Sequence, residues 1–268
     1  PAPLTPVQFG DSIILAGQAQ PQQPQHVLPG AAALVQLRWE VAADVTQRLK
    51  VSVQLLDAAG QVVAQRDSEP VGGSRPTDTW RAGEQITDNY ALPLPLGAPP
   101  GEYRLLAALY DAQTGERLHQ AGGDAVELGS VFVERPATPP PAALIPLAQR
   151  LDQQLGPVTL LGYDAYRKDF AHAPQTPLAP GDLAHVVLYW QAPDPLPAGW
   201  ADDLTVSVRL GGQSVTLPLG GPAYPSGQWQ AGEIVRSQLD ILYDGTAARG
   251  EVAVAGQVAP LEIPARSP

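Results

Sequence analysis

The sequence Trp-Arg-Ala-Gly-Glu at residues 80–84 recurs as Trp-Gln-Ala-Gly-Glu at residues 229–233, 149 positions further along (229 minus 80). A tryptophan before a tight Ala-Gly-Glu turn is an ordinary way to enter a strand, so one copy carries little information. Two copies, each set in the same longer order of signals, indicate an internal duplication. In a chain of 268 residues, the duplication predicts two domains, since about half that length is a common size for one core.

Apolar and polar side chains alternate on both sides of the repeated stretch, with the period of two that half-buried strands have. The odd positions are apolar throughout residues 33–41 and residues 49–55, and residues 184–190 repeat the first of these patterns. The sequence Asp-Ala-Ala-Gly at residues 57–60 predicts a hairpin, and Gly129 a bulge in a later strand. Roughly seven short strands per half, separated by turn signals, are typical of an immunoglobulin-like or fibronectin-III-like sandwich.

The predicted fold class is therefore all-β, with two tandem immunoglobulin/fibronectin-III-like β-sandwich domains. We assign residues 1–135 to the first domain, residues 136–150 to a Pro-rich linker and residues 151–268 to the second domain, an internal repeat of the first. Leu147, Leu151 and Leu155 are spaced four apart. This spacing fits either a short helix or a segment that covers the second core.

Composition restricts the classes of function. The net charge of −11 disfavours nucleic acid as a partner. Because the chain has no Cys, thiolate catalysis and disulfides are excluded. No apolar run approaches the ~20 residues that a membrane-spanning helix needs. The start at Pro1 and the lack of Met lead us to expect a fragment of a longer chain.

Common catalytic and cofactor-binding motifs are absent from the sequence. The sequence has no phosphate-binding glycine loop, no nucleophile elbow and no zinc-protease motif. Its four histidines stand far apart in sequence and are interpreted as surface or hydrogen-bonded structural residues. The acidic pair Asp202–Asp203 is interpreted as solubilising rather than as half of a glycosidase site. We therefore predict no catalytic residue, no metal site, no cofactor and no enzymatic activity.

Aromatic residues offer the remaining candidates for a binding surface. Trp39 and Trp190 share the phase of the apolar strand positions and are expected in the cores. Trp80 and Trp229 precede the repeated turns, where they either cap the sandwich or offer a flat surface to a sugar. Trp200 and the tyrosines near residue 165 have no counterpart in the first half. The candidate contact surface comprises Trp80, Trp200, Trp229, Tyr163 and Tyr166.

Several stretches together resemble a known module. They include Pro-Thr-Asp-Thr-Trp-Arg-Ala-Gly-Glu at residues 76–84, Pro-Pro-Gly-Glu-Tyr at residues 99–103 and Leu-Tyr-Asp-Ala-Gln-Thr-Gly-Glu-Arg-Leu at residues 109–118. The chain is similar to the C-terminal extracytoplasmic β-sandwich repeat region of bacterial membrane glycosyltransferase-like proteins of the filamentous-phototroph type. The second half departs from the pattern, because it keeps only Leu-Tyr-Asp-Gly at residues 242–245 of the last stretch.

The resemblance implies a non-catalytic interaction or positioning module outside the cytoplasm, in the cell envelope or secreted. It implies an accessory region of a larger membrane-anchored protein, tethered by a segment that this sequence does not include. Expected partners are a polysaccharide, a glycolipid or an envelope protein. The alternative is a stand-alone carbohydrate-binding or adhesin-type surface module with its own ligand site.

Overall fold

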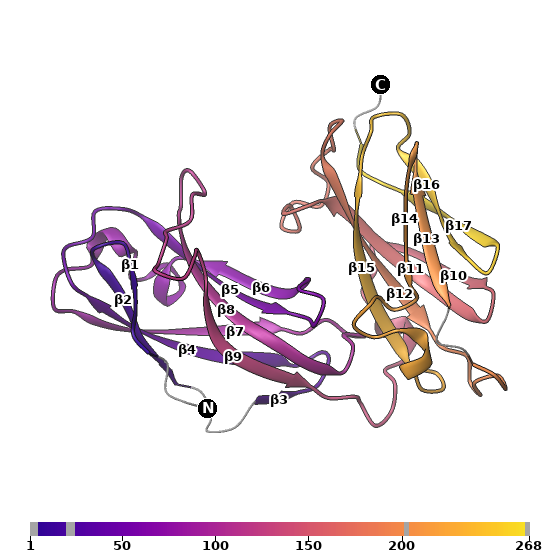
Figure 1. Ribbon diagram of the computed structural model, residues 1–268, viewed down its shortest axis with the longest axis horizontal. Coiled ribbons are helices and arrows are strands. Elements are labelled where there is room, and N and C mark those ends of the chain that lie inside the picture. The colour runs from indigo at the N-terminus through magenta and orange to yellow at the C-terminus, as the bar shows by residue number, and fades with distance from the viewer. Residues whose placement is uncertain (1–4, 20–24, 201–203, 266–268) are drawn as a thin grey trace. The chain divides into compact units, whose positions relative to one another are not determined.

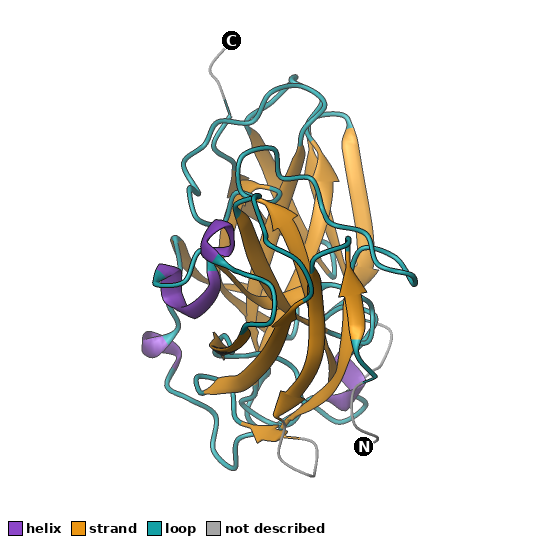
Figure 2. Cartoon of the chain, turned by 90° about the vertical axis from the view of Figure 1, so that its left-hand side faces the viewer, coloured by secondary structure: helices purple, strands orange, loops and turns teal. Residues whose placement is uncertain are grey.

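The computed structural model describes residues 5–19, 25–200 and 204–265. Strands joined by turns make up the fold, and the helical elements among these residues are short 3-10 turns (Figure 2). The all-β class predicted from the sequence is therefore confirmed. The 3-10 turns are η1 (Pro70–Gly73), η2 (Thr77–Thr79), η3 (Ala142–Leu144) and η4 (Ser226–Gln228).

The chain forms two compact units, and the first consists of Pro1–Pro95 and Pro100–Arg135. Two sheets make up this unit, with strand orders β1-β2-β4-β7 and β3-β9-β8-β5-β6 (Figure 1). All neighbours are antiparallel except β3 and β9. The strands are β1 (Val7–Phe9), β2 (Ile13–Ala19), β3 (Gln25–Val27), β4 (Ala32–Val41), β5 (Leu49–Leu56), β6 (Val62–Ser68), β7 (Gln85–Pro93), β8 (Gly101–Asp111) and β9 (Val126–Val133).

The second unit consists of Leu96–Pro99 and Pro136–Pro268. Its sheets have the orders β10-β11-β12-β15 and β14-β13-β16-β17, all antiparallel. Strand for strand these orders match those of the first unit, apart from β3, so the duplication extends to the topology. Membership of the immunoglobulin-like or fibronectin-III-like class stays a prediction. The strands are β10 (Gln149–Leu155), β11 (Val158–Arg167), β12 (Leu183–Gln191), β13 (Thr205–Leu210), β14 (Gln213–Pro218), β15 (Ile234–Leu242), β16 (Arg249–Val254) and β17 (Gln257–Glu262).

The alternating positions form the cores, as the period of two predicts. The odd-numbered residues of β4 and β5 are buried, and Trp39 and Trp190 are both fully inaccessible to solvent. The hairpin after β5 closes where predicted, with the N–H of Asp57 donating to the carbonyl of Gln61. The register shift between β8 and β9 lies next to Gly129, which confirms the predicted bulge.

The segment with leucines four residues apart forms strand β10 rather than a helix, so the helical alternative is wrong. A spacing of four is a multiple of two, so it fits the period of a strand as well as that of a helix. Leu155 is buried in the main core of the second unit, and Leu151 packs against that core. Upstream, Ile145 is buried in a separate apolar cluster, and Leu147 packs against that cluster.

The outer faces of the two matching sheets differ. On β4 this face carries Gln36, Arg38 and Glu40, which are partly or fully exposed. On β12 the face carries Val187 and Tyr189, which are buried. Both belong to a second apolar cluster, which also includes Ile145, Leu161 and Ile234. The second unit therefore buries part of both faces of this sheet.

Candidate functional site

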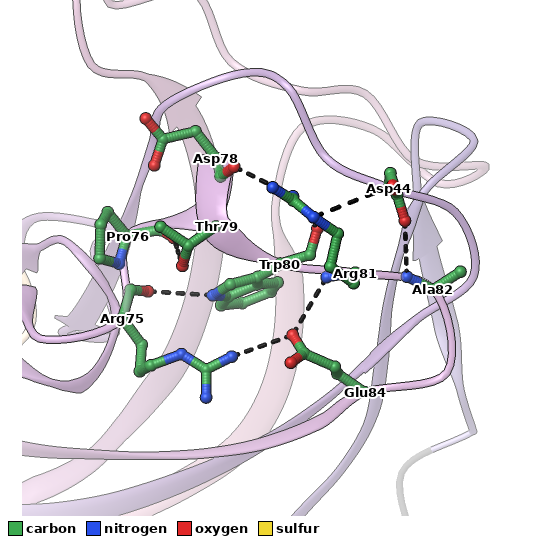
Figure 3. Close-up of polar contacts among 9 residues, drawn as sticks. All are labelled: Asp44, Arg75, Pro76, Asp78, Thr79, Trp80, Arg81, Ala82 and Glu84. Carbon is green, nitrogen blue, oxygen red and sulfur yellow. Dashed lines mark hydrogen bonds and ion pairs between the residues drawn. The ribbon is translucent and has the colours of Figure 1, made fainter.

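The first copy of the repeated stretch forms a hydrogen-bonded corner between η2 and β7 (Figure 3). The Trp80 ring is fully buried, and its centroid lies 6.4 Å from that of Trp39. Its indole N–H donates to the carbonyl of Arg75 over 3.0 Å. Both the ring and the polar atom of Trp80 are thus engaged within the fold.

Glu84 closes this corner (Figure 3). Its carboxylate accepts from the backbone N–H of Arg81 at 3.0 Å and from the guanidinium of Arg75 at 2.9 Å. The turn also requires Gly83, whose φ of 85° lies in the left-handed region that side chains disfavour. The tryptophan, the glycine and the glutamate of Trp-x-Ala-Gly-Glu therefore each have a structural reason for their identity.

The second copy has the same geometry with a different partner. Trp229 is buried, and its indole N–H donates to the carbonyl of Tyr224 over 3.2 Å. The Glu233 carboxylate accepts from the Gln230 N–H at 2.7 Å and from the Tyr224 hydroxyl at 3.0 Å. Tyr224 thus occupies the place of Arg75. Because both tryptophans are buried and both glutamates accept a backbone N–H of their own turn, the repeated motif is a structural corner.

Three of the five predicted contact residues need correction. Trp80, Trp229 and Tyr163 are 0%, 3% and 2% exposed, so they offer no ring face to a ligand. The Tyr163 hydroxyl accepts from the backbone N–H of Glu262 over 2.8 Å. Internal hydrogen-bond partners let each side chain enter the core without an unpaired polar group.

The other two predicted residues are partly exposed but lie apart. Trp200 rests against Trp229, with 6.3 Å between ring centroids, and its N–H donates to the carbonyl of Ser226 at 2.6 Å. Tyr166 lies on β11, where it packs against the second apolar cluster. The structure therefore does not gather the predicted aromatics into one surface.

Tyr166 belongs instead to a group of side chains on the outer face of the sheet β10-β11-β12-β15, which we call the outer patch. Strand register places Tyr166 beside His185 and His185 beside Asp240. Two residue pairs further along, and so on the same face, Leu183 lies opposite Leu242, and these leucines are 38% and 42% exposed. The patch comprises Tyr166, Lys168, Leu183, His185, Asp240 and Leu242.

Asp240 is the centre of the patch. Its two oxygens lie 2.7 Å from Nδ1 of His185 and 2.6 Å from Nζ of Lys168. Burial opposes ionisation of the Asp240 carboxyl, but the hydrogen bonds to His185 and Lys168 prevail and lower its pKa. The hydrogen bond between Lys168 and Asp240 also raises the pKa of Lys168. The patch is thus held together by charges that cancel one another.

Tyr166 packs against His185. Its ring centroid lies 5.2 Å from that of His185, with an interplanar angle of 43°. Burial raises the pKa of the Tyr166 hydroxyl. The result is a neutral, pre-ordered surface in which an aromatic ring and two leucines flank a paired carboxylate.

Sequence reasoning missed Lys168 and Asp240 and treated His185 as isolated. His185 and Asp240 are 55 residues apart in sequence, and only the pairing of β12 with β15 brings them together. No local pattern could have revealed that pairing. Asp202 and Asp203 lie outside the described residues.

The part of the chain that the structure describes contains neither a metal-binding cluster nor a membrane-spanning helix. There, no group of three or more His, Cys, Asp or Glu side chains is placed to hold a metal ion. None of its helices has the length and apolar character needed to cross a bilayer. No protein-family model matches the chain, and a search of curated proteins finds no match.

Proposed function

We propose that this chain is a non-catalytic interaction or positioning module that acts outside the cytoplasm. In this proposal it is an accessory region of a larger, membrane-anchored glycosyltransferase-like protein and consists of tandem immunoglobulin-like sandwiches. The outer patch of the second unit is the observation that carries the proposal. The stretches within residues 76–118 that resemble the envelope module supply the cellular context.

The composition of the outer patch suits a contact surface. Protein interfaces combine an aromatic and aliphatic centre with a polar rim and few unpaired charges. The patch offers Tyr166, Leu183 and Leu242 for apolar contact, and Lys168 and Asp240 neutralise each other. In a chain of net charge −11, such a neutral area allows an uncharged or amphipathic partner to approach. A polysaccharide, a glycolipid or the surface of an envelope protein has this character.

The rigidity of the surroundings also supports a positioning role. Strands β12 and β15, which carry four of the six patch residues, pair with each other over their full length, and a second apolar cluster lies beside the patch on the same face. A surface held in this way loses little conformational entropy when it binds. It can therefore set the position of a partner rather than merely attract it.

A stand-alone carbohydrate-binding or adhesin-type module is the second candidate. The partial exposure of the Trp200 and Tyr166 rings favours it, because aromatic rings stack on sugar faces. It differs from the first proposal in predicting an independent ligand site and no larger parent protein.

Fractionation of the source cells, followed by an antibody blot, tests the first proposal. We expect the polypeptide in the membrane fraction, at a mass far above 28.2 kDa. A secreted species near that mass would refute the accessory role and leave the second candidate as the leading one.

A binding experiment tests the outer patch itself. Purified chain would be presented to a glycan array and to vesicles that contain envelope glycolipids. We expect Tyr166→Ala and Leu183→Asp to weaken binding at least tenfold. Leu34→Asp is the matched control, since Leu34 is 61% exposed at the position of β4 that corresponds to His185 of β12. Equal losses in all three variants would contradict a role for the patch.

A further inference from the structure

Strand β14 forms the free edge of the sheet β14-β13-β16-β17. Its register with β13 is unbroken from Gln213 to Pro218. Beyond it, the N–H of Leu219 donates to the carbonyl of Leu204 on the β13 side. Since backbone groups alternate in direction along a strand, the N–H and C=O groups of Ser214 and Thr216 point away from β13. These two residues present an unpaired backbone row at the edge.

Natural proteins protect such edges with charges, prolines, bulges, short strands or covering loops. The first unit uses all of these devices. Its edge strands β1 and β3 have three residues each, and β7 ends on Pro93. The loop of η1 also contacts β7, where the N–H of Val71 donates to the Asp88 carboxylate at 2.9 Å.

The other edges of the second unit are protected in the same manner. Strand β10 contains Arg150 and Asp152 and a register shift between β10 and β11. Strand β17 has Pro260 in its interior. On β15, the carbonyl of Gly97 accepts the outward N–H of Arg236 at 2.7 Å.

The contrast is clearest between β14 and β6, which occupy the same place in the two units. Strand β6 carries Arg66 and Asp67, and its register with β5 is broken by a shift. Strand β14, with the sequence Gln-Ser-Val-Thr-Leu-Pro, has no charged residue and no shift. Its only protecting feature is the terminal Pro218. Among the edges that the structure describes, β14 is the one best suited to accept another strand.

We propose that two copies of this chain associate through β14, with the two β14 strands antiparallel and joined by backbone hydrogen bonds. A two-fold pair uses the same surface on both copies, so the edge must be compatible with itself. Strand β14 meets this condition because it has no charged residue. Two copies, each with a net charge of −11, can therefore meet at this edge without bringing like charges together. The exposed hydroxyls of Ser214 and Thr216 would then lie opposite one another, and such cross-strand hydroxyl pairs are favourable.

The size of the edge determines the strength of this association. A stable interface has about 20–30 residues on each side, whereas β14 supplies six. The association is therefore weak, and it becomes effective where copies are concentrated, as on a crowded surface. This inference does not depend on the function proposed above.

Sedimentation equilibrium of the purified chain, from low-micromolar to millimolar concentration, tests the proposal. We expect the average mass to rise from 28.2 kDa toward twice that value. Thr216→Lys and Thr216→Glu should each remain monomeric, whereas their mixture should associate again. The control is Gln65→Lys on the matching edge β6, which should behave as the unaltered chain does. Circular dichroism would verify that each variant is folded.

Hydrogen exchange supplies a second measurement that does not depend on charge. The amides of Ser214 and Thr216 should gain protection as the concentration rises, and those of β6 should not. Thr216→Pro removes an outward N–H without a loss to the β13 ladder and should abolish the association. A mass of 28.2 kDa at every concentration would overturn the proposal. The proposal would also be overturned if the amides of Ser214 and Thr216 gained protection only after an unrelated extended peptide is added. In that case the edge would bind a strand of another protein rather than a second copy.

Discussion

Replacing the two equivalent core tryptophans with phenylalanine should have unequal effects on stability. Trp39 and Trp190 are both 0% exposed. The indole N–H of Trp190 donates to the Ser237 hydroxyl over 3.0 Å. The indole N–H of Trp39 is buried and has no partner among the described residues. The loss of ring volume is similar at the two sites, so the hydrogen bond determines the difference.

The magnitude follows from what happens to each N–H. Trp190→Phe removes a hydrogen bond worth about 1 kcal/mol and leaves the Ser237 hydroxyl to find another partner. Trp39→Phe removes a buried donor that has no partner. The desolvation cost of that donor, about 1 kcal/mol or more, then no longer destabilises the folded state. We therefore expect Trp190→Phe to cost about 2 kcal/mol more unfolding free energy than Trp39→Phe, as the sum of these two effects.

Native-state hydrogen exchange with mass spectrometry is the suitable assay, because peptides from β4 and β12 report on each unit separately. Ser237→Ala is the companion variant, and it should destabilise only the second unit, by about 1–3 kcal/mol. Equal losses for the two phenylalanine variants, or a greater loss for Trp39→Phe, would refute the reasoning.

Three further perturbations test other parts of the structure. Trp39→Ala and Trp190→Ala should each cost about 3–5 kcal/mol, and a loss below 1 kcal/mol in denaturant titration would contradict core packing. Gly83→Ala should cost about 1–2 kcal/mol, because alanine is strained at this φ, and unchanged stability would contradict a requirement for glycine. The pKa of Asp240 is lowered from 3.8, so its contribution to stability is present above pH 3.8 and is lost as the pH falls through the folded-state pKa. Asp240→Asn should flatten this acid dependence in urea titrations of the second unit, and an unchanged profile would contradict the ion-pair assignment.

The buried faces of the strands could be predicted because a strand repeats every two residues, and this local rule places Val51 and Val53 correctly without any knowledge of their neighbours. A related signal for the covered sheet was also present. The run Val186 to Trp190 is apolar at every position, which is typical of a strand buried on both faces. The matching stretch of β4 alternates instead, with Gln36 and Arg38 between its apolar residues.

The outer patch could not be predicted, because it depends on the register between strands that are distant in sequence. The same limit explains the misplaced aromatic residues. Trp80 follows a loop, and the sequence does not tell whether such a ring turns inward. Its burial depends on two groups that fold back onto it, the carbonyl of Arg75 and the ring of Trp39. The first is close in sequence, but the second lies on β4, 41 residues earlier (80 minus 39).

The internal duplication lets one unit serve as a control for the other. Features shared by both units are requirements of the fold, and the corner closed by Glu84 and Glu233 is the clearest of them. Features found in only one unit are free to serve other purposes. The covered outer face, the outer patch and the uncharged edge β14 all belong to the second unit. This asymmetry supports the proposal that the outer patch of the second unit is a contact surface, since the matching face of β4 carries the polar residues Gln36, Arg38 and Glu40 instead.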